Sequence, residues 1–323
     1  MALLDIEHLE IGFGRLAAVR GASFTVHKGE THCLVGESGC GKSVSALAVM
    51  GLLAPTARRS ARALRFDGQD LLGLNERAIS RLRGDRMAMI FQEPMTSLNP
   101  AYTVGSQMAE VMVRHRGVSK RAALDRAAEL LERVRITSPG MRLGQYPHQL
   151  SGGLRQRVMI AMALMCSPEL LIADEPTTAL DVTVQAQILK LLADLQQDLG
   201  LASLLITHDL GLVARVAHRV SVMYAGEVVE TGPVADLFGA PMHPYTRGLL
   251  SCVPVPGKIE PGSPLGSIPG IVPRVELGFT GCAFRQRCTL AGPDCEGSIT
   301  LRDVGQAGHA YLCQREAAAV AGL

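Results

Sequence analysis

The sequence has 323 residues, more than one compact core usually holds, so we expect a main domain and an appendage. Lys and Arg number 32 against 30 Asp and Glu, and the net charge of +2 argues against a polybasic surface that binds nucleic acid or anionic lipid. The longest apolar run, VMIAMALMC, is shorter than the roughly 20 residues of a membrane-spanning helix, and the first residues lack a secretory signal pattern. We therefore expect a cytosolic chain whose eight cysteines are free thiols, redox groups or metal ligands.

Short apolar runs alternate with longer helical patterns along most of the chain, which indicates an α/β fold. The expected strands are Ala22–Val26, His32–Val35, Met87–Phe91, Leu170–Ala173 and Ala202–Thr207. Apolar residues at three- and four-residue spacing predict helices between Gln107 and Arg135, within a helical insert at about residues 93–159, and over Val184–Leu199. From about Gly239 proline and glycine become frequent, which predicts a main domain at 1–238 and a C-terminal extension at 239–323.

The segment GESGCGKS matches the pattern G-x-x-x-x-G-K-[ST] and stands between an expected strand and an apolar helix, as a phosphate-binding loop requires. A glycine-rich turn that matches by accident is the alternative. The residues expected to hold the phosphates are Gly36, Ser38, Gly39, Cys40, Gly41, Lys42 and Ser43. Backbone N–H groups of such a loop can turn towards phosphate oxygens, and the helix start adds positive potential. We expect Lys42 to reach the β- and γ-phosphates and Ser43 to ligate Mg²⁺.

The segment LLIADEP is a short apolar run that ends in two carboxylates. In an open parallel sheet that end lies at the edge where the phosphate loop also stands. Asp174 can hold the water shell of Mg²⁺, and Glu175 is suited to be the general base for a water that attacks the γ-phosphate. Taken alone, the pattern also fits a solvated acidic turn after a strand.

The segment LSGGLRQR is typical of a helix start. Ser151 is a good N-cap, and Gly152 and Gly153 expose N–H groups to whatever lies ahead of the helix. We expect a second anion site there, on a helix that is also buried through the apolar run that follows.

The order of these motifs resembles that of ABC-transporter ATPases. The matching motifs are GESGCGKS, Gln92 after its strand, LSGGLRQR, LLIADEP, TALD and ITHD, and the resemblance covers about residues 1 to 238. It implies a P-loop ABC-type core with a mixed sheet, an N-terminal antiparallel β part and an inserted helical subdomain, which binds ATP and Mg²⁺. In this family two such domains face each other head to tail, so that the signature helix of one closes on the ATP of the other. That arrangement accounts for the second anion site.

The resemblance also implies roles for single residues. Phe13 resembles the aromatic residue that stacks on adenine, although an ordinary core phenylalanine is the alternative. Gln92 resembles the glutamine that senses Mg²⁺ and the attacking water, and Asp181 the aspartate at the dimer contact. His208 resembles the switch histidine that contacts the γ-phosphate. Since none of the motifs is degenerate, we expect a subunit that hydrolyses ATP.

The C-terminal extension resembles that of oligopeptide and dipeptide importer ATP-binding subunits, the peptide/nickel family, through MHPYTRGLLSCVP and IPGIVP. Cys282, Cys288, Cys295 and Cys313 follow with the spacing C-x5-C-x6-C-x17-C. Four thiols in such a segment can hold zinc or an iron-sulfur cluster, and the spacing decides neither between these nor against no metal at all. The resemblance favours a [4Fe-4S] cluster with a structural role.

The resemblance implies the energy-coupling subunit of a membrane importer, with di- or oligopeptides as the default cargo and nickel or another small solute as the alternative. The implied partners are a second homologous ATPase subunit, with a heterodimer favoured over a homodimer, two membrane permease subunits and, indirectly, an extracytoplasmic binding protein. No nucleic acid is expected, and the implied location is the cytoplasmic face of the inner or plasma membrane. A soluble ABC ATPase that acts on nucleic acid or ribosomes is the competing class, and a regulator with an inactive site is a third.

Overall fold

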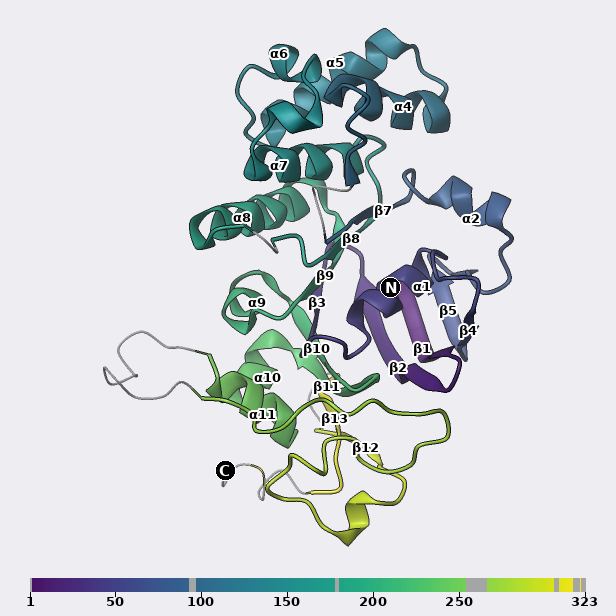
Figure 1. Ribbon diagram of the computed structural model, residues 1–323, viewed down its shortest axis with the longest axis vertical. Coiled ribbons are helices and arrows are strands. Elements are labelled where there is room, and N and C mark those ends of the chain that lie inside the picture. The colour runs from purple at the N-terminus through teal and green to yellow at the C-terminus, as the bar shows by residue number, and fades with distance from the viewer. Residues whose placement is uncertain are drawn as a thin grey trace. The chain divides into compact units, whose positions relative to one another are not determined.

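The structure is a computed structural model that describes residues 2–92, 97–177, 180–253, 266–304, 308–315 and 320. Its contacts divide the chain into two compact units. Unit 1 holds Met1, His27–Glu30 and Gly73–Ile206, and unit 2 holds Ala2–Val26, Thr31–Leu72 and Thr207–Leu323. Each unit is described by itself below, on the ribbon of Figure 1. The predicted division between residues 238 and 239 rests on the change of composition at Gly239 and on the extent of the family resemblance, and it stays a prediction.

Unit 1 contains three neighbouring parallel strands that are almost entirely buried. They are β7 (Met87–Ile90), β8 (Leu170–Asp174) and β9 (Ala202–Thr207), whose last residue falls in unit 2. Every residue of β8 is buried, which explains its unbroken apolar sequence, because a strand covered on both faces needs no alternation. Helices α2 (Glu76–Leu82) and α8 (Val182–Leu199) belong to the same unit. The strand predicted at Ala202–Thr207 is confirmed to the residue.

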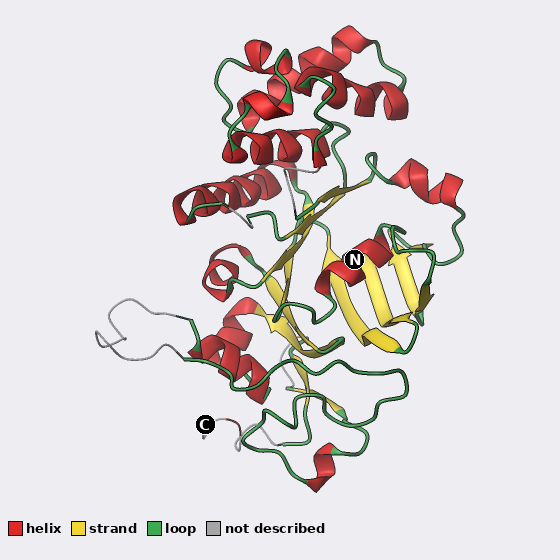
Figure 2. Cartoon of the chain, in the orientation of Figure 1, coloured by secondary structure: helices red, strands yellow, loops and turns green. Residues whose placement is uncertain are grey.

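The helical insert forms a group of its own within unit 1, drawn without strands in Figure 2. Its elements are α4 (Val104–Arg116), α5 (Lys120–Arg133), α6 (Pro139–Leu143), the short 3-10 helix η1 (Pro147–Gln149) and α7 (Gly152–Ala163). Thr103 and Ser119 cap α4 and α5 through their hydroxyl groups, while Gly117, in the left-handed region, ends α4. The apolar positions of α5 are buried against α4 and α7, as their spacing predicts.

Unit 2 contains an antiparallel sheet near the N-terminus in the order β2-β1-β5-β6, with β4 also paired to β1. The strands are β1 (Ala2–Phe13), β2 (Leu16–His27), β4 (Ala57–Ser60), β5 (Ala63–Phe66) and β6 (Gln69–Asp70). Helix α1 (Lys42–Val49) packs against β1. This sheet bears out the antiparallel β part that the family resemblance implies.

The remaining strands of unit 2 form a mixed sheet in the order β3-β10-β11-β13-β12. They are β3 (Thr31–Val35), β10 (Arg219–Tyr224), β11 (Glu227–Pro233), β13 (Ala310–Leu312) and β12 (Leu301–Asp303). The accompanying helices are α9 (Leu210–Val216), α10 (Val234–Gly239), α11 (Pro244–Ser251) and the 3-10 helix η2 (Pro293–Cys295). Since β13 pairs with β11, the C-terminal extension adds strands to the sheet that carries the phosphate loop.

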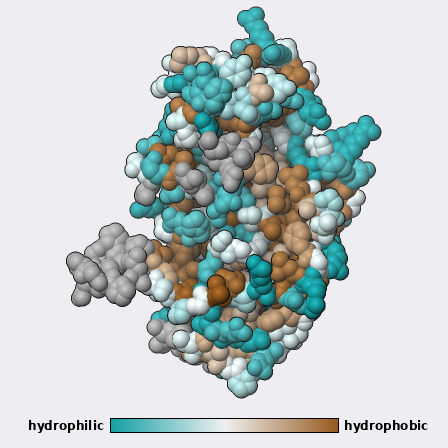
Figure 3. Space-filling model, in the orientation of Figure 1, coloured by the Kyte–Doolittle hydropathy of each residue, from teal (hydrophilic) through white to brown (hydrophobic). Residues whose placement is uncertain are grey.

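Most of the described extension is loop. Within unit 2 it is held to the start of β2 and the turn before it by backbone hydrogen bonds from Ala17 to Val275 and from Leu277 to Arg15, each at 2.9 Å. Hydrophobic and hydrophilic residues are interspersed on the face that Figure 3 draws. In the part of the chain that the structure describes, no helix is long and apolar enough to cross a membrane.

Candidate nucleotide-binding site

The phosphate loop connects β3 to α1 and depends on glycine at two crowded positions. A Cβ on Gly36 would lie 2.1 Å from the carbonyl oxygen of Met223, and one on Gly41 would lie 2.5 Å from that of Ala18. Both glycines have positive φ, 152° and 105°. Because backbone atoms cause these clashes, no side-chain rearrangement could relieve them. Only glycine fits at these two positions of the loop.

The tip of the loop is open. Ser38 and Gly39 are exposed, and a Cβ on Gly39 would meet no atom within 4 Å. Gly41 is the N-cap of α1 and supplies no side-chain hydrogen bond, so no capping side chain covers the first N–H groups of this helix. An open, glycine-lined helix start of this kind fits phosphate oxygens. Ser43, half-buried in the first turn, offers a hydroxyl oxygen, a ligand type that Mg²⁺ accepts.

Lys42 is buried, 4% exposed, beneath the loop. Its Nζ donates to the carbonyl oxygens of Gly36 at 2.8 Å and Glu37 at 2.9 Å. The neighbouring thiol of Cys40 is also buried; burial raises its pKa, against the opposing effect of Lys42. The ammonium group is thus hydrogen-bonded to the carbonyls of its own loop.

The carboxylate motif stands at the carboxyl end of β8 in unit 1. Asp174 is the last residue of the strand and is 5% exposed. Glu175 follows with φ of 43°, in the left-handed region that side chains rarely adopt, and its N–H donates to the carbonyl of Ile206 at 3.0 Å. Nε2 of Gln92 donates to Oε2 of Glu175 at 2.9 Å. The structure thus brings together two of the predicted catalytic residues, Gln92 and Glu175.

The predicted second anion site is a capped helix start in unit 1. Oγ of Ser151 accepts from the N–H of Leu154 at 3.4 Å, and Ser151 and Gly152 are exposed. A Cβ on Gly153 would lie 3.1 Å from Cγ1 of Val184 in α8, so this glycine allows α7 and α8 to approach closely. Asp181 caps α8 in the same way and is exposed. Thr178 and Ala179 of the TALD motif lie outside the described residues.

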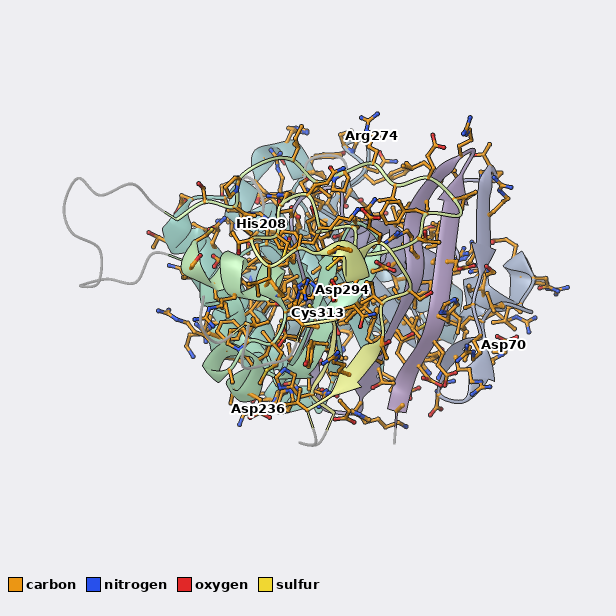
Figure 4. The ribbon with its side chains drawn as sticks, turned by 90° about the horizontal axis from the view of Figure 1, so that it is seen from below. Asp70, His208, Asp236, Arg274, Asp294 and Cys313 are labelled. Atoms are coloured by element: carbon orange, nitrogen blue, oxygen red, sulfur yellow. The ribbon has the colours of Figure 1, made fainter. Side chains whose placement is uncertain are left out.

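Two further predicted residues, His208 and Phe13, belong to unit 2. His208 follows β9 and is exposed; Figure 4 labels it. Asp209, the next residue, caps α9. Phe13 ends β1 opposite Ala57 of β4 and is half-buried, so part of its ring remains accessible for stacking. The segment after Gln92, Glu93 to Thr96, lies outside the described residues.

The predicted [4Fe-4S] cluster at Cys282, Cys288, Cys295 and Cys313 is wrong. All four are free cysteines that line one small pocket, with Cys313 labelled in Figure 4. Among the described residues, however, no group of three or more His, Cys, Asp or Glu side chains is arranged to hold a metal ion. The same finding leaves the zinc alternative without a ligand group.

The environment of Cys282, Cys288 and Cys313 favours the neutral thiol. Burial raises the pKa of Cys282 to about 11 and also raises the pKa values of Cys288 and Cys313. A thiolate, rather than a thiol, is the form that ligates metals. What holds this part of the extension is ordinary hydrogen bonding: Arg315 donates to the carbonyl of Leu290 and to the carboxylate of Asp294, both at 2.8 Å.

Comparisons with known proteins decide the family. Residues 19–178 match the family described as ABC transporter, and residues 229–295 match the oligopeptide/dipeptide transporter C-terminal region. The dipeptide transport ATP-binding protein DppD of Escherichia coli K12 is 52% identical over 299 residues, which cover 91% of each chain. This chain belongs to the ABC transporter ATPases. A probable peptide ABC transporter ATP-binding protein of Sinorhizobium fredii, y4tR, is 51% identical over 97% of this chain and 95% of its own.

Solved structures of ABC transporter ATPases have the same fold as this chain. Part of the ABC transporter complex cbiONQ, cbiO1 of Clostridium perfringens, has a TM-score of 0.65 at 27% identity and covers 74% of this chain and 91% of its own. The bacterial cassette MJ0796, whose structure is dimeric, has a TM-score of 0.64 at 26% identity and covers 72% and 98%. The predicted α/β ABC-type core and the ATPase activity of the family are thereby confirmed.

The sequence does not predict the contact between Glu37 of the phosphate loop and Arg287 of the extension. Glu37 occupies a variable position of the loop motif, and Arg287 stands directly before Cys288 in the extension. The structure joins them in an ion pair across 250 positions of the chain. A contact over such a separation leaves no periodicity or motif, so only the three-dimensional structure could reveal it.

Proposed function

We propose that this ABC ATPase is the energy-coupling subunit of a membrane importer for di- or oligopeptides. The observation that carries the proposal is the match over nearly the whole chain to peptide-import ATP-binding proteins, which includes the separate match of the C-terminal region. The proposed assembly contains a second, homologous ATPase subunit, two permease subunits and an extracytoplasmic binding protein, with this chain at the cytoplasmic face of the membrane. Nucleic acid has no part in it.

In the proposed site the phosphate loop binds the nucleotide, with Lys42 at the β- and γ-phosphates and Phe13 against the adenine ring. The open tip at Gly39 and the helix start without a capping side chain support this assignment. Ser43 would ligate Mg²⁺ and Asp174 would hold its water shell, and the bound ion would neutralise phosphate charge. His208 contacts the γ-phosphate. In this proposal the nucleotide-binding domain spans 1–238, and the oligopeptide-transporter-type C-terminal extension spans 239–323.

Hydrolysis in this proposal needs one proton acceptor. Glu175 takes a proton from the attacking water, and Gln92 orients the carboxylate through the hydrogen bond that the structure contains. Ser151, Gly152 and Gly153 bind the ATP held by the partner ATPase subunit, and Asp181 lies at the dimer contact. Binding of ATP closes the pair, and hydrolysis reopens it.

Reconstitution tests the proposal. The chain, its partner ATPase, the permeases and the binding protein, placed in proteoliposomes, should hydrolyse ATP faster when a di- or oligopeptide saturates the binding protein, and labelled peptide should accumulate inside. Stimulation by nickel instead of peptide would replace the cargo, and stimulation by RNA or DNA would replace the function.

A further inference from the structure

Glu37, the second residue of the phosphate loop, is held at three separate points within unit 2. Its backbone N–H donates to Oη of Tyr245 at 3.0 Å. Its carboxylate accepts from Nη1 of Arg287 at 3.0 and 3.1 Å. Its carbonyl oxygen accepts from Nζ of Lys42 at 2.9 Å. Two of the three partners, Tyr245 and Arg287, come from the C-terminal extension.

Arg287 is fixed by the extension before it reaches the loop. Its Nε donates to the carbonyl of Pro269 at 2.8 Å and its Nη2 to that of Ile268 at 3.0 Å. The side chain is 5% exposed. Because the guanidinium group is planar and its donors point in fixed directions, these two bonds determine where Nη1 points. It points to Glu37.

Aromatic rings pack beside the Arg287 end of this ion pair. The rings of Tyr224, Tyr245 and Phe284 lie with centroids 4.6 to 5.4 Å apart, and the guanidinium of Arg287 lies 5.7 Å from the ring centre of Tyr224. Tyr224 and Tyr245 are fully buried. Burial raises the pKa of Tyr245, so its phenol stays neutral. The Arg287 end of the ion pair is therefore buried, whereas the Glu37 side chain is 29% exposed and the pair is partly screened by solvent.

We propose that Arg287 is a positioning residue for the phosphate loop. Through Glu37, the C-terminal extension sets the conformation of the loop and the place of the Lys42 ammonium group. The inference rests on the proposed function, in which this loop binds ATP. It gives the extension a part in nucleotide binding.

The test compares four variants of the full-length chain: Arg287→Ala, Arg287→Lys, Glu37→Gln and the double variant Arg287→Ala/Glu37→Gln. Arg315→Ala is the matched control, since Arg315 makes comparable bonds inside the extension, to Leu290 and Asp294. The measurements are the affinity for MgATP, kcat and KM for ATP, and the temperature of unfolding.

We expect Arg287→Ala and Glu37→Gln each to weaken MgATP affinity by roughly 10- to 100-fold, and the double variant to be no weaker than either single one, because both remove the same contact. Arg287→Lys, which keeps the charge but loses the fork, should fall between Arg287→Ala and the wild type. Arg315→Ala should lower the unfolding temperature about as much as Arg287→Ala does, and it should leave MgATP affinity unchanged.

Three outcomes would overturn the inference. They are unchanged affinity and KM in Arg287→Lys and Glu37→Gln, additive effects in the double variant, and an equal loss of affinity in Arg315→Ala. If Arg287→Ala fails to fold, Arg287→Lys and Glu37→Gln still decide. A wild-type chain that binds no MgATP would overturn the proposed function itself, which separates the two failures.

Discussion

Nε2 of Gln92 lies 2.9 Å from Oε2 of Glu175, and the pairing of two parallel strands brings them together. Ile90 of β7 stands opposite Ala173 of β8, so the residues two positions beyond each strand residue also come close. The amide of Gln92 donates to one carboxylate oxygen of Glu175, and a carboxylate can accept several hydrogen bonds. The register of β7 and β8 therefore places a hydrogen-bond donor on the proposed general base.

The first prediction concerns this hydrogen bond. Gln92→Ala should lower kcat for ATP hydrolysis by roughly 10- to 100-fold, because the carboxylate of Glu175 loses the contact that orients it. The KM for ATP should change much less. Steady-state kinetics measure both, with Gln187→Ala as the control, since Gln187 is an exposed side chain that accepts from Arg157. A kcat equal to that of the wild type would remove Gln92 from the site.

The loop glycines give a second, contrasting pair of variants. Gly36→Ala should disrupt the loop, because the new Cβ would lie 2.1 Å from a backbone oxygen. Gly39→Ala should cost only about 1 kcal/mol for its positive φ, since nothing lies within 4 Å of the new Cβ. Thermal unfolding should rank Gly36→Ala well below Gly39→Ala. Equal unfolding temperatures would show that the loop tolerates a side chain at residue 36.

A third prediction separates capping from phosphate binding at Ser151. Ser151→Ala and Ser119→Ala each remove a hydroxyl that caps a helix in the insert, so each should cost about 1 kcal/mol of stability. Only Ser151→Ala should also reduce ATP hydrolysis by the assembled ATPase pair. If both variants lower hydrolysis equally, or neither does, Ser151 is a cap and nothing more.

A fourth prediction concerns pH and the buried His243 in unit 2. Burial lowers its pKa from 6.5 to about 4, so the folded protein keeps the ring neutral while the unfolded chain takes up a proton. Stability is therefore full above pH 6.5 and falls towards pH 4, by about 1.4 kcal/mol per pH unit and about 3 kcal/mol in total.

The control for this prediction is His243→Asn. Nδ1 of His243 accepts from the N–H of Tyr245 at 3.1 Å, and an Asn oxygen can take over that role without titrating. Urea unfolding at several pH values should show the steeper acid slope for the wild type. Parallel slopes in the two proteins would mean that His243 does not contribute to the acid sensitivity.

The sequence predicts strands best where they are buried and apolar. Leu170–Ala173 and Ala202–Thr207 coincide with β8 and β9 to within a residue, because a fully buried strand needs only apolar side chains. The short edge strands β4, with the sequence ARRS, and β6, with QD, carry no such signal. β4 depends on its pairing with the distant strand β1, which leaves no local pattern. β6 is joined to β5 by the two-residue turn Asp67–Gly68, both with positive φ, so this hairpin determines it.

Local motifs in the sequence identify the candidate loop residues, but they do not show which distant side chains contact one another. Backbone crowding requires glycine at residues 36 and 41 of the loop motif, and Lys42 donates to the loop carbonyls, whereas Gly39 stands in open space. The spacing of the four cysteines, by contrast, does not say whether their thiols converge on a metal, and the cluster prediction failed on that point. The contact of Arg287 with Glu37 depends on the folded extension and has no counterpart in local sequence.

The most direct test of the proposed function is the rate of MgATP hydrolysis by the assembled ATPase pair with Glu175→Gln in this chain, measured beside MgATP affinity. Glu129→Gln, which makes the same change in an exposed ion pair of α5, is the control. We predict that Glu175→Gln lowers hydrolysis at this chain's catalytic site by at least about 100-fold, while MgATP still binds and holds the pair closed. Hydrolysis equal to that of Glu129→Gln would contradict the assignment of Glu175 as the general base.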